Sequence, residues 1–190
     1  MNHEISNRHF VLAGILVFAA FSRLIPHPPN FTALGAMALF GGAYIHNRIF
    51  AVLFPLSALW ISDIILNNLV YSEFYKGFVL FSHSHIWIYI SFVIIAIVGQ
   101  LIIKKVNIKT MGLSALSASV IFFILSNFGV WAQGLMYPLS FSGLIACYIA
   151  ALPFFGWTLI GNFFFCAILF GSFELAANKI ISLQTVVSNK

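Results

Sequence analysis

The sequence predicts an all-α fold: a single transmembrane domain over residues 1–190, built as a polytopic bundle of about six membrane-spanning helices. The first observation is composition, since 62% of the residues are hydrophobic and only 7% are charged, with a mean hydropathy of +1.04. A soluble domain carries roughly 25% charged residues. The second is length, because 190 residues accommodate about six apolar runs of ~20 residues with short loops. Lipid is therefore expected to surround most of this chain.

Apolar runs between polar breaks define the expected spans. The first run begins behind Arg8 and resembles the apolar part of a signal peptide, but no small-x-small cleavage site follows it, so we expect it to remain as a span. The second run is short for a membrane crossing. The predicted helices are 9–25, 32–46, 49–69, 86–103, 110–128 and 154–177.

Residues 139–152 form a further apolar run, bracketed by Pro138 and Pro153. As a complete span it would move Lys179 and Lys190 to the outer side. Only five basic residues would then lie on the inner side, against four on the outer side. We therefore expect a half-length or re-entrant helix, which is tolerated at membrane depth when it packs on protein or lines a cavity.

The basic residues indicate the orientation. With a cytoplasmic N-terminus, only Arg23 and Lys76 fall outside, and seven basic residues fall inside. This positive-inside asymmetry predicts that both termini are cytoplasmic (N-in/C-in). The four tryptophans then lie near the outer interface as an aromatic belt. The inner residues are Arg8, Arg48, Lys104, Lys105, Lys109, Lys179 and Lys190, and the tryptophans are Trp60, Trp87, Trp131 and Trp157.

Small residues recur at helical spacing, as Ala38 with Gly42 and Ser114 with Ala118. Such pairs favour close helix packing within the bundle. Docking to a partner subunit is the alternative.

The first outer loop carries three candidate ligand-binding residues: Arg23, His27 and Asn30. Three prolines, at 26, 28 and 29, fix φ and remove backbone donors over this short stretch. A stiff loop of this kind suits contact with a ligand, and a tight interhelical turn explains it equally well.

Asp63 is the acidic residue that lies well inside a predicted span. A charge there costs at least ~2.5 kcal/mol, so the carboxyl group must be protonated, paired or directed into a polar cavity. Its position near the outer end of the helix places it within reach of Arg23 or His27. We expect either a ligand-binding role or a purely structural ion pair.

Two further groups of polar residues fall on the same outer side. His83 and His85 form an H-x-H pair before the fourth span, and imidazole nitrogens suit Zn, Cu, Fe, Ni or Co, free or within a cofactor. Solvated loop histidines are the alternative. Asn127, Trp131 and Gln133 close the fifth span and offer donors and acceptors, although a helix cap followed by a belt tryptophan also fits. The convergence of these weak signals on one side predicts an outward-facing ligand site.

Several function classes lack support in the sequence. The basic residues stand singly at the ends of apolar runs, which argues against nucleic-acid binding. There is no phosphate-binding glycine loop and no D-x-x-D pair. Active transport would therefore need a partner protein or an ion gradient as its source of energy.

Over nearly its whole length the chain resembles a family of small, uncharacterised bacterial integral membrane proteins, and four short motifs carry this resemblance. The layout is also similar to the substrate-binding S components of energy-coupling factor transporters, and most closely to the cobalamin-binding type. That resemblance implies a bacterial cytoplasmic (inner) membrane location and assigns ligand roles to His27 and Asp63. The cobalamin-binding type uses a cysteine in the third outer loop to bind cobalt; none is present here, and His83 or His85 would have to substitute. The motifs are Arg23-x-x-Pro26-His27-Pro28-Pro29-Asn30-Phe31, Ser62-Asp63, Ser126-Asn127-Phe128-Gly129-Val130-Trp131 and Tyr148 through Phe155.

The leading hypothesis is a substrate-binding membrane subunit for uptake of a micronutrient, vitamin or corrinoid-like, with cobalamin as the possible bound substrate. Its expected partners are the lipid bilayer, a small-molecule ligand and a transmembrane energising subunit with ATPases. One alternative is a metal- or haem-binding membrane enzyme that uses the outer histidines and Asp63. Another is a non-catalytic assembly subunit in which the outer polar residues only pair with one another.

Overall fold

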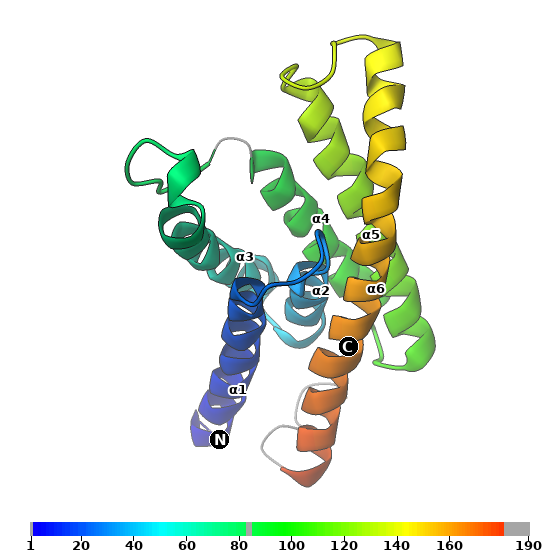
Figure 1. Cartoon of the computed structure of the whole chain (residues 1–190). Helices are drawn as coiled ribbons and strands as arrows, with labels where there is room; N and C mark the ends of the chain where they lie inside the picture. Colours follow the sequence, from blue (N-terminus) through cyan, green and yellow to red (C-terminus); the bar gives the residue numbers. More distant parts are fainter. Residues whose placement is uncertain (1, 83–84, 181–190) are drawn as a thin grey trace.

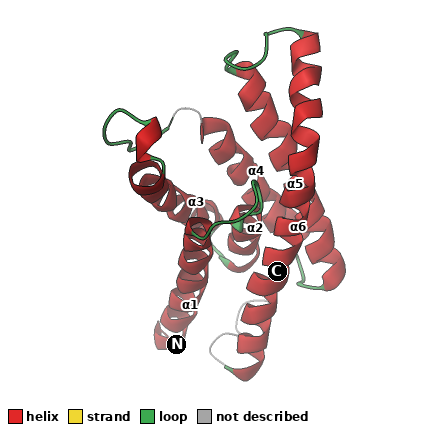
Figure 2. Ribbon diagram, viewed as in Figure 1, coloured by secondary structure: helices red, strands yellow, loops and turns green. Residues whose placement is uncertain are grey.

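The computed structural model describes residues 2–82 and 85–180, and the side chains of residues 2–7 and 9 within that range are not described. Across these residues the fold is all-helical, as predicted, with six α-helices and no strand (Figures 1 and 2). Short 3₁₀ turns follow α1 (η1, Ser22–Leu24) and precede α4 (η3, Ser72–Phe74), and α3 continues into a π-helical turn (η2, Leu66–Val70). The α-helices are α1 (Asn2–Phe21), α2 (Leu34–Tyr44), α3 (Arg48–Ile65), α4 (Ile86–Ile102), α5 (Ile108–Ala132) and α6 (Phe141–Lys179).

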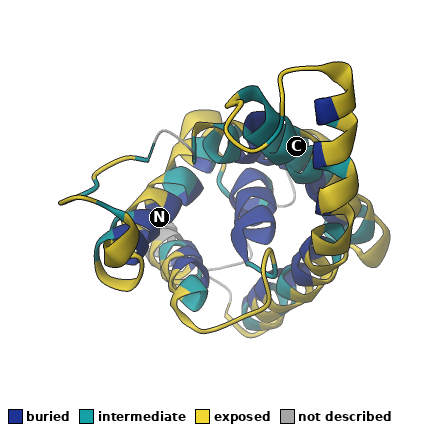
Figure 3. Ribbon diagram, turned by 45° about the horizontal axis from the view of Figure 1, so that its top comes forward, coloured by how far each residue is buried: buried dark blue, intermediate teal, exposed yellow. Residues whose placement is uncertain are grey.

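The shortest helix, α2, occupies the centre of the bundle. It packs against each of the other five α-helices, and ten of its eleven residues are buried. Figure 3 shows this helix in dark blue inside a ring formed by the other helices. A helix that is apolar all round must be buried either in lipid or in protein, and here protein surrounds it.

Glycines allow the neighbouring helices to approach α2 closely. A Cβ atom on Gly42 would lie 2.4 Å from the backbone oxygen of Ala96 in α4, and one on Gly35 would lie 2.2 Å from Oδ1 of Asn162 in α6. Gly41 meets Pro55 of α3 in the same way, at 2.5 Å. Gly42 was predicted from its spacing with Ala38 to mediate close helix packing, and the structure confirms this.

Three helical stretches are long and apolar enough to cross a membrane, namely Arg48–Val70, Ile108–Ala132 and Phe141–Lys179. The apolar parts of the other helices are shorter: Phe10–Leu24, Leu34–Tyr44 and Ile86–Ile102. The described residues thus contain the predicted number of six helices, but only three helical stretches are long enough to cross a membrane. The apolar character of 32–46 reflects burial inside the bundle, which hydropathy alone does not distinguish from burial in lipid.

The prediction of a separate half-length or re-entrant helix at 139–152 is wrong. Residues 141–152 form the first third of α6, a continuous helix of 39 residues with Pro153 inside it. Ser140 caps its start by accepting a hydrogen bond from the Gly143 amide at 3.2 Å. At about 1.5 Å per residue the helix is about 58 Å long, and its upper part forms with the end of α5 the hairpin at the top of Figure 1.

The first turn of α1 and the last turn of α6 lie at the same end of the bundle, at the bottom of Figure 1, and the α5–α6 connection lies at the opposite end. We call the end with the α5–α6 connection the outer end and the other the inner end, following the predicted orientation.

Candidate functional site

An ion pair between Arg23 and Asp63 lies near the outer end. Arg23 belongs to η1, directly after α1, and Asp63 lies in the last turn of α3. The Arg23 Nη1 atom donates to Asp63 Oδ1 at 2.5 Å and to Ser62 Oγ at 2.8 Å. The side chain of Asp63 is 7% exposed and that of Arg23 is 16% exposed. The carboxylate predicted to need a partner therefore has one, joining two helices that are separated in the sequence.

Two residues of the α4 region complete the surroundings of Asp63. The Tyr89 hydroxyl donates to Asp63 Oδ2 at 2.8 Å, and His85 Nδ1 lies 3.6 Å from the same oxygen. Arg23, Ser62, Asp63, His85 and Tyr89 form one connected group, which we call the Asp63 cluster. It ties together η1, α3 and the start of α4.

The cluster orients a histidine. With Nδ1 turned toward the carboxylate, the Nε2 atom of His85 is the ring nitrogen left to bind a ligand, and the His85 side chain is 26% exposed. Metal-binding histidines commonly direct their second ring nitrogen to a carboxylate in this way, which fixes the ring orientation. Among the described residues no group of three or more His, Cys, Asp and Glu could hold a metal ion. The arrangement can therefore supply one imidazole ligand rather than a complete ion site.

The loop that contains Arg23, His27 and Asn30 is anchored at both ends, but it does not bring all three together. His27 is exposed, and its Nδ1 lies 2.9 Å from the Pro28 carbonyl oxygen. Asn30 adopts a positive φ of 66° and lines a small hollow with Asn162 of α6. The Phe31 ring packs on the rings of α6, including Trp157 at a centroid distance of 6.4 Å. Only Arg23 of the three reaches the Asp63 cluster through a described contact.

The three candidates at the end of α5 make local hydrogen bonds. Asn127 Nδ2 donates to the Phe123 carbonyl, and Gln133 Nε2 donates to that of Gly129. Trp131 Nε1 donates to the Pro138 carbonyl in the α5–α6 connection at 3.1 Å. These contacts fix the geometry of the hairpin, and none of them involves the Asp63 cluster.

The end of α5 and the start of α4 nevertheless pack tightly. A Cβ on Gly129 would lie 2.3 Å from Cγ of Trp87, and the rings of Trp87 and Phe128 meet edge to face with their centroids 4.9 Å apart. Because Trp87 lies two residues after His85, this contact places the Asn127 region beside the α4 end of the Asp63 cluster. The predicted metal ligand His83 lies outside the described residues.

Trp60 of α3 and Asn68 of η2 attach the segment between η2 and α4. Asn68 exchanges hydrogen bonds with Val79, donating to its carbonyl at 2.8 Å and accepting from its amide at 2.7 Å. Trp60 Nε1 donates to the Leu80 carbonyl at 3.0 Å. The loop that leads to His85 is thus folded back on α3.

Sequence reasoning did not single out Ser62, Tyr89 or Asn68 as members of this region. Ser62 appeared only as the neighbour of Asp63. The signal for Tyr89 is its spacing of four residues from His85, which places both on one helix face. Asn68 lies five residues after Asp63, and this spacing does not place two residues on the same face of an α-helix.

A second polar group, also missed from the sequence, lies at the inner end. Arg8 Nη2 lies 3.5 Å from the Tyr44 carbonyl oxygen, and its guanidinium stacks 5.5 Å from the centroid of the Phe173 ring. The Tyr44 hydroxyl donates to the Glu174 carboxylate of α6. These residues join the ends of α1, α2 and α6.

A family model, described as a family of unknown function (DUF6580), matches residues 3–185. Comparisons with curated proteins and with solved structures give no match.

Proposed function

The chain belongs to the DUF6580 family, and we propose that it is a substrate-binding membrane subunit for uptake of a micronutrient that it captures at its outer end. The observation that carries this proposal is the Asp63 cluster. A buried carboxylate holds a guanidinium, a phenol and an imidazole together at the end of the bundle with few basic residues. Ionisable residues within membrane segments are costly and usually mark functional sites.

The proposal includes an N-in/C-in chain that crosses the bacterial cytoplasmic membrane several times. Three stretches have the length to cross, and the remaining helices contribute to the same bundle around α2. Large apolar side chains are exposed along α6 and on more than one of its faces, as expected for a helix that is largely surrounded by lipid. They include Ile145, Ile149, Leu152, Phe154, Trp157, Ile160, Phe163, Phe164 and Ile168. The 39-residue length of α6 is compatible with a bilayer core of ~30 Å only if the helix is tilted or extends beyond it.

The substrate class follows from the single oriented imidazole. A bare metal ion requires several protein ligands, whereas a metal inside a macrocycle brings most of its own and needs one axial ligand. His85, oriented by Asp63, is suited to that axial position. A corrinoid such as cobalamin is therefore the proposed substrate, with the neighbouring outer loops as its cap.

Uptake also requires energy, and the sequence holds no nucleotide-binding motif. We therefore include a transmembrane energising partner with ATPases in the proposal. Haem is the second candidate ligand, because the same oriented imidazole suits its iron. In that case the protein would be a haem-binding membrane protein.

The test is retention of a coloured ligand. Purified protein in neutral detergent is incubated with cobalamin or haem, passed through a desalting column and measured by absorbance, with calorimetry for the ligand that is retained. We expect stoichiometric cobalamin, loss of binding in His85→Gln, and unchanged binding in His3→Gln, a histidine replaced at the opposite end of α1. Retention of haem alone would favour the second candidate, and retention of neither would overturn both and favour a structural role for the cluster.

A further inference from the structure

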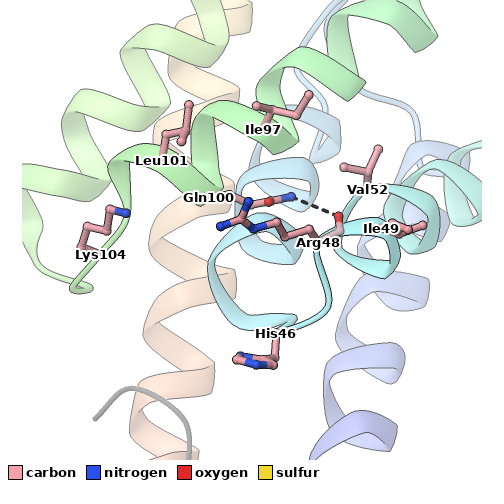
Figure 4. A pocket seen from close by; sticks show the side chains of 8 residues that line it. All are labelled: His46, Arg48, Ile49, Val52, Ile97, Gln100, Leu101 and Lys104. Carbon is pink, nitrogen blue, oxygen red and sulfur yellow. Dashed lines mark hydrogen bonds between the residues drawn. The ribbon is translucent and has the colours of Figure 1, made fainter. Parts of the chain in front are cut away.

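A concave site lies at the inner end, far along the helices from the Asp63 cluster. It is a groove of about 850 Å³ between the start of α3 and the end of α4, lined by His46, Arg48, Ile49, Val52, Ile97, Gln100, Leu101 and Lys104. Figure 4 shows these side chains around the space between the two helix ends. We call it the α3–α4 groove.

Side chains from both helices fix the shape of the groove. Gln100 of α4 donates from Nε2 to the backbone oxygen of Arg48 at 3.3 Å, the hydrogen bond drawn in Figure 4. Asn47 caps α3 by accepting hydrogen bonds from the Ile49 and Phe50 amides. The beginning of α3 is thus tied to the last turn of α4, so the positions of the two helix ends that border the groove are fixed relative to each other.

The polar part of the groove is cationic. Arg48 begins α3 and Lys104 follows α4, and the charged ends of both side chains point into the space between the helix ends (Figure 4). His46 adds an imidazole, and the lining contains no carboxylate. Among the described side chains the carboxylate ion pairs involve Arg23 and His85, not Arg48 or Lys104. The groove therefore presents two positive charges that an anion could neutralise.

The rest of the lining is aliphatic and exposed. Ile49, Leu101 and Ile97 are 68%, 64% and 44% exposed. Ile49 follows Arg48 directly, Leu101 lies three residues before Lys104, and Ile97 lies about one helical turn before Leu101. A soluble anion would leave this apolar surface in water, whereas a lipid acyl chain would cover it.

We propose that the α3–α4 groove binds an anionic phospholipid of the inner leaflet, with its phosphate between Arg48 and Lys104 and an acyl chain along Ile49, Ile97 and Leu101. The charge matches an anionic headgroup, the adjoining surface matches hydrocarbon, and the groove lies at the end of the bundle where basic residues gather. Basic pockets between helices on the cytoplasmic side of a membrane bind lipid head groups on this principle. The site is independent of the ligand at the outer end.

The test compares two pairs of neutralised cations. Arg48→Gln/Lys104→Gln removes the charges of the groove. Lys105→Gln/Lys109→Gln removes two charges from the same end of the bundle that do not line it, so net charge is matched. Native mass spectrometry measures binding of dioleoyl phosphatidylglycerol to each protein in neutral detergent, with dioleoyl phosphatidylcholine as the neutral comparison. Size-exclusion profile and circular dichroism establish that each variant is folded.

We expect the wild-type chain to bind phosphatidylglycerol in preference to phosphatidylcholine. The groove variant should lose about thirtyfold in affinity, since each basic side chain near an anionic headgroup contributes roughly a factor of five. The control variant should change less than about threefold, as expected for screened charges outside the groove. Equal losses in the two variants, or no preference for phosphatidylglycerol, would overturn the proposal.

A third arm distinguishes the lipid from soluble anions. Inorganic phosphate at millimolar concentration should leave phosphatidylglycerol bound, because it gains nothing from the aliphatic wall. Displacement by phosphate would overturn the lipid assignment and identify a site for a soluble anion. If Ile97→Ser/Leu101→Ser, which leaves both cations in place, does not weaken lipid binding, the assigned path of the acyl chain is wrong.

Discussion

Arg23 and Asp63 are separated by forty positions in the sequence, and Nη1 of one lies 2.5 Å from Oδ1 of the other. The pair fixes the end of α1 to the end of α3, and Tyr89 adds α4 through the second carboxylate oxygen. The Asp63 carboxylate therefore connects three elements of the outer end, namely η1, α3 and α4.

Replacing Asp63 with Asn should destabilise the protein, because Arg23 would keep its charge at a largely buried site without a counter-ion. We expect a loss of about 3 kcal/mol of unfolding free energy, the lower end of the range for breaking a buried pair, since Arg23 is partly exposed. Denaturant titration in detergent, followed by tryptophan fluorescence, measures the loss. Lys76→Gln is the control, because Lys76 is the other basic residue of the outer end and is exposed, and it should change stability little.

A double-mutant cycle with Arg23→Gln isolates the pair itself. The double variant should lose clearly less than the sum of the two single variants, because it leaves no unpaired charge. Strict additivity would show that the two side chains do not interact in the folded protein.

The arrangement of α2 gives a second prediction. A methyl group at Gly42 would meet the backbone oxygen of Ala96 at 2.4 Å, and a helix backbone cannot move aside as a flexible side chain can. Gly42→Ala should therefore push α2 from α4 and cost about 1–3 kcal/mol, as overpacked cores do.

The matched control is Gly156→Ala in α6, where nothing lies within 4 Å of the added Cβ. Alanine is the better helix former, so this variant should be neutral or more stable by up to about 1 kcal/mol. Thermal unfolding in detergent measures both. Equal behaviour of the two variants would contradict the close approach of α2 and α4.

The helices were largely predictable from the sequence, since each apolar run lies largely within a helix. The number of spans was not, because hydropathy reports burial without saying whether lipid or protein provides it. For α2 it is protein, and that depends on where five other helices lie. The continuity of α6 was missed because Pro153 indicates a break in water, whereas helices in membranes accommodate proline when neighbouring groups satisfy the backbone.

The candidate site was predictable in part, for a different reason. A carboxylate within an apolar run must have a partner, so the pairing of Asp63 could be expected, and Arg23 was one of two candidates. Tyr89 lies four residues after His85 and so shares a helix face with it, but this spacing alone does not show that the Tyr89 hydroxyl donates to Asp63. Asn127 and Gln133 were expected near the same ligand, but their side chains bond to their own helix, a choice that polarity alone does not reveal.

The inner polar group gives a third prediction. The Tyr44 hydroxyl donates to the Glu174 carboxylate, and Tyr44 is 3% exposed. Tyr44→Phe keeps the ring packing and removes the donor, so it should cost about 1.5–3 kcal/mol, the value of a hydrogen bond to a charged group. Tyr148→Phe is the comparison, because it removes a 2.7 Å hydrogen bond to a backbone carbonyl of α5 and should cost about 1 kcal/mol. Denaturant titration distinguishes them, and a smaller loss for Tyr44→Phe would contradict a charged acceptor.

The orientation of the chain can be tested with single cysteines. Both native cysteines, Cys147 and Cys166, are buried, and a variant with serine at both positions provides an unreactive background. Met136→Cys introduces a thiol in the α5–α6 connection, where Met136 is 75% exposed. Lys105→Cys introduces one at an exposed position between α4 and α5.

The positive-inside asymmetry places position 136 outside and position 105 in the cytoplasm. A membrane-impermeant maleimide added to intact spheroplasts should therefore label Met136→Cys at once and Lys105→Cys only after lysis. The reverse labelling pattern would show that the bundle has the opposite orientation. The Asp63 cluster would then lie on the cytoplasmic side, and the proposal of uptake from outside would be wrong.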